Sequence, residues 1–408
     1  MNQKLLNRNK KFSDFNRWMY VFLGIIIMMS LGTVYSYSVF RGPIEAVYSI
    51  GTTQSGMPYM FALAFYALFM FLSGKHLDKF KPRLIMIMGG LLVSLGWILS
   101  SFAPNIFVLT ITYGMMVGAG VGIIYGVPMS VVARWFPEKK GLAVGMVLIG
   151  FGLSPLVTAP LARILIEQYG IMQAFQILGL TFGGLITLLA LPFKHPPTFD
   201  QMRLKIVENS PNVSDDLNTS SMLQSKSFKG VYINFIIGTT IGLMLIGLTS
   251  NIGTELIGLS PRQVALLMAL FAIFNGLGRP VFGLLTDKLS TQKAMYISFI
   301  MIISAALLML LSEEGTVTIF IVSFSIFWFN LGGWLAIAPT STLVLYGTKH
   351  YSQNYGVVFT AYGIGAITGV LTSGILIDLL QNYYYVFYYV IALCSIGFIT
   401  TLKLIKGA

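Results

Sequence analysis

Charged residues are scarce in this sequence. They make up 10% of its 408 residues, whereas 56% are hydrophobic. A water-soluble globular chain carries roughly 25% charged residues. The chain therefore lacks the side chains that a polar exterior needs, which excludes a large soluble fold. Its apolar residues instead fall in runs long enough to cross a hydrocarbon core about 30 Å thick.

Side chains for catalysis and metal binding are also scarce. The sequence has one cysteine, Cys394, three histidines and 14 acidic residues. The histidines fall in predicted loops, and no acidic residue falls clearly at mid-depth in a predicted span. A membrane enzyme would need convergent catalytic groups, a cation or drug exporter would need an intramembrane carboxylate, and a sensor would normally add a soluble output domain. We expect none of these, and no cofactor, metal site or enzyme activity.

Twelve apolar segments are predicted to cross the membrane as helices. They are residues 18–40, 52–73, 84–103, 106–133, 142–166, 172–193, 230–253, 261–283, 294–311, 316–345, 355–378 and 383–402. Lys and Arg gather in alternate connecting segments, on the side that also holds both chain ends. This asymmetry follows the positive-inside rule and predicts a multi-pass protein of the cell membrane with both termini cytoplasmic. The net charge of +12 then reflects topology and attraction to anionic lipid, not nucleic-acid binding.

The chain reads as two related halves. A polar segment, 196–229, is predicted to be a solvated linker between six-helix bundles at 1–195 and 230–408. The pattern Gly-x-x-x-Asp-Lys follows both the second and the eighth span, 209 residues apart, as Gly74, Asp78, Lys79 and as Gly283, Asp287, Lys288. Pro128 and Pro339 are 211 residues apart. Matches at a common offset indicate a duplicated six-helix unit.

The two Gly-x-x-x-Asp-Lys loops resemble the signature of the major facilitator superfamily. This resemblance implies an all-α membrane protein, with 12 transmembrane helices in two six-helix bundles, whose charged loops act in gating. A narrower resemblance, to the oxalate/formate antiporter family and the related monocarboxylate transporters, covers nearly the whole chain. It rests on Tyr35-Ser-Tyr-Ser-Val-Phe40, Gly120-Val-Gly-Ile-Ile-Tyr125, Trp135-Phe-Pro-Glu-Lys-Lys-Gly141, Asn275-Gly-Leu-Gly-Arg279-Pro280, Gly332-Gly333 and Asn354-Tyr-Gly-Val-Val-Phe-Thr-Ala361.

Arg279 is the main candidate for substrate binding. It lies eight residues before Asp287, about 12 Å inside its helix end. An arginine at such depth costs roughly 2.5–3.5 kcal/mol or more to insert and usually marks a substrate path. Its guanidinium stays charged and can hold a carboxylate through two parallel hydrogen bonds. The alternative is an arginine that snorkels or braces the loop. The family resemblance favours the role of carboxylate ligand.

One departure from the family bears on the substrate. In the oxalate carriers that this chain resembles, the eleventh span carries a lysine as a second cation, where this sequence has Tyr362. With one buried cation, a dianion would keep an uncompensated charge at a cost of several kcal/mol. We therefore expect a secondary transporter of monocarboxylates such as lactate, pyruvate or formate. A dicarboxylate/formate antiporter, or a carrier of an unrelated organic solute, stays open.

Polar aromatic residues complete the predicted site. By resemblance, Tyr35, Tyr125, Phe359 and Tyr362 line the carboxylate site, and Trp334 is a further candidate donor. Helix packing or interfacial anchoring is the alternative for each of them.

The coupling mechanism stays open at this stage. Asn275 is also a candidate substrate-binding residue, and it stands where the related monocarboxylate transporters carry an acid. Proton symport therefore lacks an obvious proton carrier, whereas anion exchange needs none. The expected partners are a small organic anion, membrane lipid and in one alternative protons, and the expected state is a monomer.

Overall fold

The computed structural model describes residues 2–74, 80–136, 140–195, 217–347 and 350–405. Within these ranges it describes side chains for residues 17–74, 80–136, 143–195, 217–347, 350–351 and 353–405. The described residues are helical throughout, apart from short connections. The first half forms α1 (Asn2–Leu31), η1 (Gly32–Ser36), α2 (Ser38–Tyr48), α3 (Thr52–Gly74), α4 (Pro82–Ser100), α5 (Ile106–Leu109), η2 (Thr110–Val117), α6 (Gly118–Trp135), α7 (Lys140–Tyr169) and α8 (Ile171–Ala190).

The second half begins with a short helix inside the predicted linker. Its helices are α10 (Thr219–Gln224), α11 (Lys226–Asn251), η3 (Ile252–Leu256), α12 (Pro261–Lys288), α13 (Thr291–Met309), α14 (Val317–Tyr346), α15 (Tyr351–Leu380) and α16 (Tyr384–Leu404). The backbone N–H of Leu217 donates to the carbonyl of Tyr346 at 3.1 Å, and Asn354 Nδ2 donates to the carbonyl of Leu217 at 3.0 Å. The end of the linker is therefore docked on α14 and α15, whereas a solvated segment was predicted. The domain boundaries stay a prediction.

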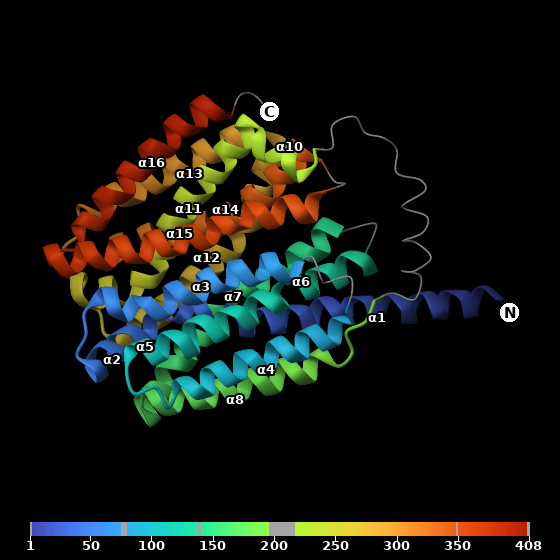
Figure 1. The fold of residues 1–408 in the computed structure, drawn as a ribbon, viewed down its shortest axis with the longest axis horizontal. Helices are drawn as coiled ribbons and strands as arrows, with labels where there is room; N and C mark the ends of the chain where they lie inside the picture. The colour runs from blue at the N-terminus through green and yellow to red at the C-terminus, as the bar shows by residue number, and fades with distance from the viewer. Residues whose placement is uncertain (1, 75–79, 137–139, 196–216, 348–349, 406–408) are drawn as a thin grey trace.

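Twelve helical stretches of the described residues are long and apolar enough to cross a membrane. Their positions match the predicted spans to within a few residues at most ends. The helices of the first half gather in one bundle and those of the second half in another, and the two lie side by side (Figure 1). The predicted all-α fold of twelve transmembrane helices in two six-helix bundles is confirmed.

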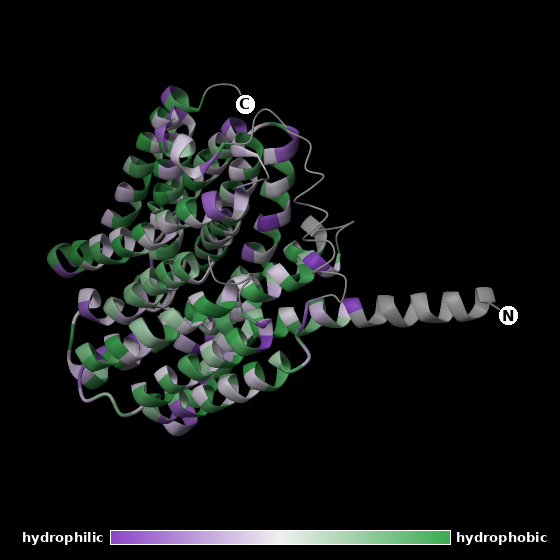
Figure 2. Cartoon of the chain, turned by 45° about the vertical axis from the view of Figure 1, so that its right-hand side comes forward, coloured by the Kyte–Doolittle hydropathy of each residue, from purple (hydrophilic) through white to green (hydrophobic). Residues whose placement is uncertain are grey.

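The apolar exterior of the helices explains why the chain needs a membrane. Strongly polar residues lie mostly near the helix ends, and apolar residues run along the helix lengths (Figure 2). In α4, a stripe at three- and four-residue spacing is about half exposed: Leu84, Met88, Leu91 and Leu95. The opposite face of α4 buries Gly89, Gly90, Val93, Gly96 and Trp97. A helix with an apolar face outward and a small-residue face inward suits a bilayer.

The first span is not one continuous helix. A 3-10 segment, η1, separates α1 from α2 and carries Tyr35. A Cβ placed on Gly32 would lie 2.4 Å from the carbonyl oxygen of Phe151, so the backbones of η1 and α7 meet closely. Interruptions of this kind in a membrane helix are tolerated where neighbouring elements satisfy the backbone, and they often occur at binding sites.

Two helix pairs form the seams between the bundles. α3 of the first half packs along α15 of the second, and α7 of the first half packs along α12 of the second. The predicted substrate-site residues lie on α12, α15, η1 and α6, except for Trp334, which lies on α14.

Candidate functional site

Arg279 lies inside the α7–α12 seam. α12 ends nine residues later at Lys288, about 14 Å along the helix axis. The side chain is 7% exposed, and its Nη1 donates to the carbonyl of Leu148 on α7 at 2.6 Å. Its Nε and Nη2 have no hydrogen-bond partner among the described residues. Since a buried charge without acceptors is costly, these two adjacent donors favour an anionic ligand.

Arg41 provides an internal comparison. Arg41 and Arg279 are the two buried cationic side chains of the described residues. All three guanidinium nitrogens of Arg41 are bonded: Nε to Ser55 Oγ at 3.2 Å, Nη1 to the carbonyl of Gly247 at 2.9 Å, and Nη2 to the carbonyl of Thr52. Arg41 therefore holds protein groups together, whereas Arg279 keeps donors for another molecule.

Asn275 lies one helical turn before Arg279 and is completely buried. Its Nδ2 donates to the carbonyl of Trp328 on α14 at 3.0 Å, and its Oδ1 has no partner among the described residues. The neighbouring backbones leave little room to move. A Cβ on Gly332 would lie 2.0 Å from the Asn275 carbonyl oxygen, and a Cβ on Gly278 would lie 2.0 Å from that of Phe329. The glycines thus let α12 and α14 meet backbone to backbone, which holds Asn275 in place.

Gly152 on α7 faces both polar residues of α12. A Cβ on Gly152 would lie 2.7 Å from Asn275 Oδ1 and 3.4 Å from both Nε and Nη2 of Arg279. These are the three atoms that lack partners. The bare backbone of Gly152 therefore packs directly against these three atoms, and a side chain at this position would clash with Asn275.

An aromatic cluster lies beside Gly152 and Arg279. The hydroxyls of Tyr35 and Tyr362 are 2.9 Å apart and bond the first span to α15. The Phe151 ring, next to Gly152 in sequence, lies 5.1 Å from Tyr35 and 5.3 Å from Tyr125, between centroids. The Phe359 and Tyr362 rings stack at 5.0 Å. Tyr35 also lies within electrostatic range of the Arg279 guanidinium. Four predicted aromatic residues, Tyr35, Tyr125, Phe359 and Tyr362, are therefore together beside the Arg279 seam.

Trp334 does not join this cluster. Its indole packs on α11, where a Cβ on Gly238 would lie 2.3 Å from ring atoms, and its ring centroid is 5.3 Å from that of Phe299 on α13. The interior of the second bundle therefore surrounds it. The ring fills the space that Gly238 leaves, and its Nε1 has no hydrogen-bond partner among the described residues, so the role of Trp334 as a donor to a substrate stays a prediction.

The gating loops are only partly described. Gly74 ends α3 with open space around its Cα, whereas Asp78 and Lys79 lie outside the described residues. Gly283 also borders open space, and Asp287 and Lys288 are exposed in the last turn of α12. Their role in gating stays a prediction.

Three residues of the cluster escaped the sequence reasoning: Tyr66, Phe151 and Gly152. The Tyr66 ring lies 5.0 Å from Tyr125, 5.8 Å from Phe151 and 5.5 Å from both Phe359 and Tyr362, which makes it the centre of the cluster. A tyrosine in the middle of the apolar run 52–73 was the available signal for Tyr66. Nothing in the sequence distinguishes Gly152 from its neighbour Gly150, which faces Ile25 of α1.

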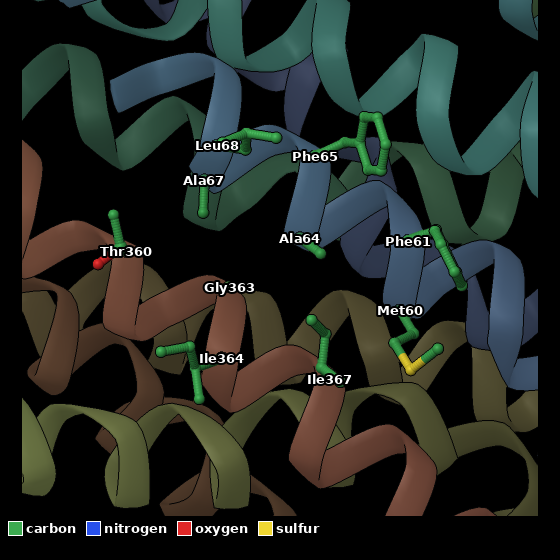
Figure 3. A pocket seen from close by; sticks show the side chains of 10 residues that line it. All are labelled: Met60, Phe61, Ala64, Phe65, Ala67, Leu68, Thr360, Gly363, Ile364 and Ile367. Carbon is green, nitrogen blue, oxygen red and sulfur yellow. The ribbon is translucent and has the colours of Figure 1, made fainter. Parts of the chain in front are cut away.

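An apolar groove lies on the other seam, between α3 and α15. Its lining is Met60, Phe61, Ala64, Phe65, Ala67, Leu68, Thr360, Gly363, Ile364 and Ile367 (Figure 3). The only hydroxyl in it, on Thr360, is bonded to Tyr232 at 2.8 Å. The groove offers no group that would hold an anion, so it is separate from the polar site at Arg279.

Polar contacts close the seam at the end of the molecule that holds α2, away from both chain ends (Figure 1). Arg41 reaches Gly247 on α11, and the carboxylate of Asp378 on α15 accepts from the backbone N–H groups of Thr52 and Thr53, at 3.0 and 2.9 Å. Nearby, Tyr383 donates to Glu255 at 2.9 Å, and burial together with this carboxylate raises the pKa of Tyr383 above its usual value. The bonds of Arg41 and Asp378 join the two halves directly, whereas the Tyr383–Glu255 bond lies within the second half.

The described residues contain no group of three His, Cys, Asp or Glu side chains placed to hold a metal ion. The polar atoms that converge on the site instead suit a small organic ion.

Comparisons with known proteins agree with this architecture. The family model of the Major Facilitator Superfamily matches residues 12–248 and 227–407. The oxalate:formate antiporter of Oxalobacter formigenes is 30% identical over 87% of this chain and 83% of its own length. Monocarboxylate transporter 12 of Xenopus laevis is 26% identical over 75% of this chain and 70% of its own.

A solved structure shares the fold. The crystal structure of a bacterial homologue of the human lysosomal transporter Spinster, in an inward-facing and unoccupied conformation, superposes with a TM-score of 0.73 at 14% identity. It covers 96% of this chain and 98% of that one. Given the family match over both halves, this chain is a multi-pass membrane transporter that belongs to the major facilitator superfamily.

Proposed function

We propose that this transporter carries small monocarboxylates across the cell membrane, with both termini in the cytoplasm. The observation that supports this most is the contrast between its two buried arginines. All three guanidinium nitrogens of Arg41 donate hydrogen bonds to protein groups, whereas Nε and Nη2 of Arg279 have no partner among the described residues. These two nitrogens form the edge that grips a carboxylate through parallel hydrogen bonds.

The opposite wall of the site supports a single negative charge. At the place where the resembling oxalate carriers have a lysine, Tyr362 is buried and bonded to Tyr35 at 2.9 Å. Both side chains are neutral, so a second carboxylate would meet no cation there. A dicarboxylate is the alternative because a relative named for oxalate is 30% identical. The cost of an unpaired buried charge, several kcal/mol, disfavours it.

The site is compatible with two forms of coupling. An exchanger needs only that Arg279 bind one carboxylate at a time. A proton symporter needs a group that takes up the proton, and Asn275 next to Arg279 cannot do so. The site therefore supports exchange more directly than symport.

Uptake into proteoliposomes tests the proposal. Purified protein should take up labelled lactate, pyruvate or formate, with and without a pH gradient or an unlabelled anion inside. Arg279→Ala and Arg279→Lys should reduce uptake to the level of empty vesicles, because neither keeps the paired donors. Arg262→Ala removes an exposed arginine at the other end of the same helix and serves as the matched control. Normal uptake by an Arg279 variant, or transport of organic cations but of no carboxylate, would refute the proposal.

A further inference from the structure

The atoms that face Gly152 have more polar character than a carboxylate alone requires. Three of them are buried and have no partner among the described residues: Nε and Nη2 of Arg279, which donate, and Oδ1 of Asn275, which accepts. Both carboxylate oxygens are acceptors. A simple carboxylate would satisfy the two donors and leave the Asn275 oxygen facing another acceptor.

The orientation of the Asn275 amide is fixed by its neighbour. Its Nδ2 donates to the Trp328 carbonyl at 3.0 Å. If the amide were turned over, Oδ1 would face that carbonyl oxygen, and two acceptors would be in contact. The close packing of α12 on α14 at Gly278 and Gly332 also prevents the side chain from withdrawing. The proposed binding site therefore presents one acceptor, Asn275 Oδ1, beside the two donors of Arg279.

We infer that Asn275 makes the site selective for 2-hydroxy monocarboxylates. This inference rests on the proposed function and adds a determinant of specificity. The carboxylate would lie on Nε and Nη2 of Arg279, and the hydroxyl on the adjacent carbon would donate to Asn275 Oδ1. The Gly152 backbone covers these atoms here, since a Cβ on it would lie only 2.7 Å from Oδ1, so the ligand would reach them when α7 moves away from α12.

Other substituents at that carbon fit less well. A 2-oxo group is an acceptor and would face Oδ1 without a hydrogen bond. An unsubstituted acid leaves the buried Oδ1 unpaired, so it should bind about tenfold or more weakly than the 2-hydroxy acid. An ammonium group could donate to Oδ1, but it would bring a positive charge close to the Arg279 guanidinium. The hydroxyl is the neutral donor.

A competition assay in proteoliposomes tests the selectivity. Unlabelled L-lactate, propionate, pyruvate and L-alanine would compete with labelled L-lactate for uptake by the wild-type protein. Lactate should compete about 10-fold or more better than propionate and pyruvate, and alanine should be weakest. Equal competition by lactate and propionate would overturn the inference while leaving monocarboxylate transport intact. If no monocarboxylate is transported at all, the proposed function itself fails.

Two variants test the residues. Asn275→Leu keeps the side-chain shape and removes the acceptor, so the ratio of lactate to propionate competition should fall to about one. A general loss of packing would lower uptake of both acids and leave the ratio unchanged, and an unchanged ratio would overturn the assignment of Asn275. Gly152→Ala would place a Cβ 2.7 Å from Asn275 Oδ1, so it should crowd the acceptor and weaken lactate binding more than propionate binding. Gly184→Ala, in open space on α8, is the matched control; if Gly152→Ala behaves like this control, the atoms that face Gly152 are not the binding site.

The thermal shift of the purified protein provides a second readout. L-lactate should raise the melting temperature of the wild-type protein more than propionate does at equal concentration. The difference should disappear in Asn275→Leu. A difference that persists in this variant would place the hydroxyl elsewhere and overturn the inference.

Discussion

In the proposed site, Tyr362 limits the number of substrate charges that can be neutralised. Its hydroxyl is hydrogen-bonded to that of Tyr35, and its ring stacks on Phe359 at 5.0 Å between centroids. Tyr362 therefore forms a rigid and neutral wall of the proposed site. Tyrosine is a common packing residue in membrane helices, and its sequence position alone does not reveal a partner. The contact with Tyr35, 327 residues away in the chain, links its role to the first span.

Tyr362→Lys should shift substrate preference toward dicarboxylates. The new ammonium would lie near the hydroxyl of Tyr35 and provide the second cation that a dianion needs. Oxalate uptake relative to lactate uptake should rise about tenfold or more, measured in proteoliposomes at fixed pH. Tyr362→Met has a similar length without the charge and should leave oxalate uptake low. An oxalate-to-lactate ratio that does not move in Tyr362→Lys would contradict the charge-matching argument.

The sequence predicted helices better than it predicted contacts. Runs of apolar residues gave the twelve spans, because length and hydropathy suffice to define a membrane helix. The break at η1 was not predicted, since it depends on the close approach of Gly32 to the α7 backbone. α10 was also missed: a short polar helix has little signal of its own, and it is held by contacts with Tyr346 and Asn354.

The same division holds for the site. Arg279 was found because charge inside a span is rare, and Tyr35, Tyr125, Phe359 and Tyr362 were found through family motifs. Tyr66 and Gly152 could not be found in this way, because their importance comes from helices that meet only in the folded protein. For a related reason the role of Trp334 stays a prediction: a tryptophan in a span can face either the cavity or its own bundle, and here the ring packs beside Gly238.

Asp378 on α15 caps the start of α3. Its carboxylate accepts from two backbone N–H groups that would otherwise lack partners at the helix N-terminus, where negative charge is favourable. Since the two helices belong to different bundles, the cap also fastens this end of the seam.

Asp378→Asn should weaken this end of the seam. The variant loses the charge and one of the two acceptor oxygens, so the purified protein should lose about 0.5–1 kcal/mol of stability. A lower temperature of thermal unfolding would show this. Glu313→Gln removes an exposed charge in the turn before α14 and is the control. Equal unfolding temperatures for the two variants would mean that the cap contributes nothing measurable.

The two bundles touch along two seams of different chemistry. The α7–α12 seam is polar at Arg279 and Asn275, whereas the α3–α15 seam contains the apolar groove shown in Figure 3. In this superfamily fold, transport is expected to proceed by rocking one bundle against the other around a fixed site. Both seams must then rearrange in every cycle.

A reversible crosslink across the α3–α15 seam should stop transport. A Cβ on Gly363 would lie 3.0 Å from Ala67 Cβ, whereas disulfides usually place the two Cβ atoms about 3.5–4.5 Å apart, so a small shift would allow a bond. Ala67→Cys with Gly363→Cys, in a Cys394→Ser background, should lose uptake on oxidation and recover it with reductant. The two single-cysteine proteins, treated in the same way, should be unaffected. Full uptake by fully crosslinked protein would mean that this seam stays still.

The hydrogen bond from Arg279 to the Leu148 carbonyl ties the bundles together through the side chain that is proposed to hold the cargo. If α7 and α12 part while the carrier is empty, Nη1 loses this acceptor, and all three guanidinium nitrogens are then without a partner. In the loaded carrier, a bound carboxylate would still accept hydrogen bonds from two of these nitrogens. The conformational change that returns the carrier should therefore be easier with a bound anion than without one. Export of one anion would then promote uptake of the next.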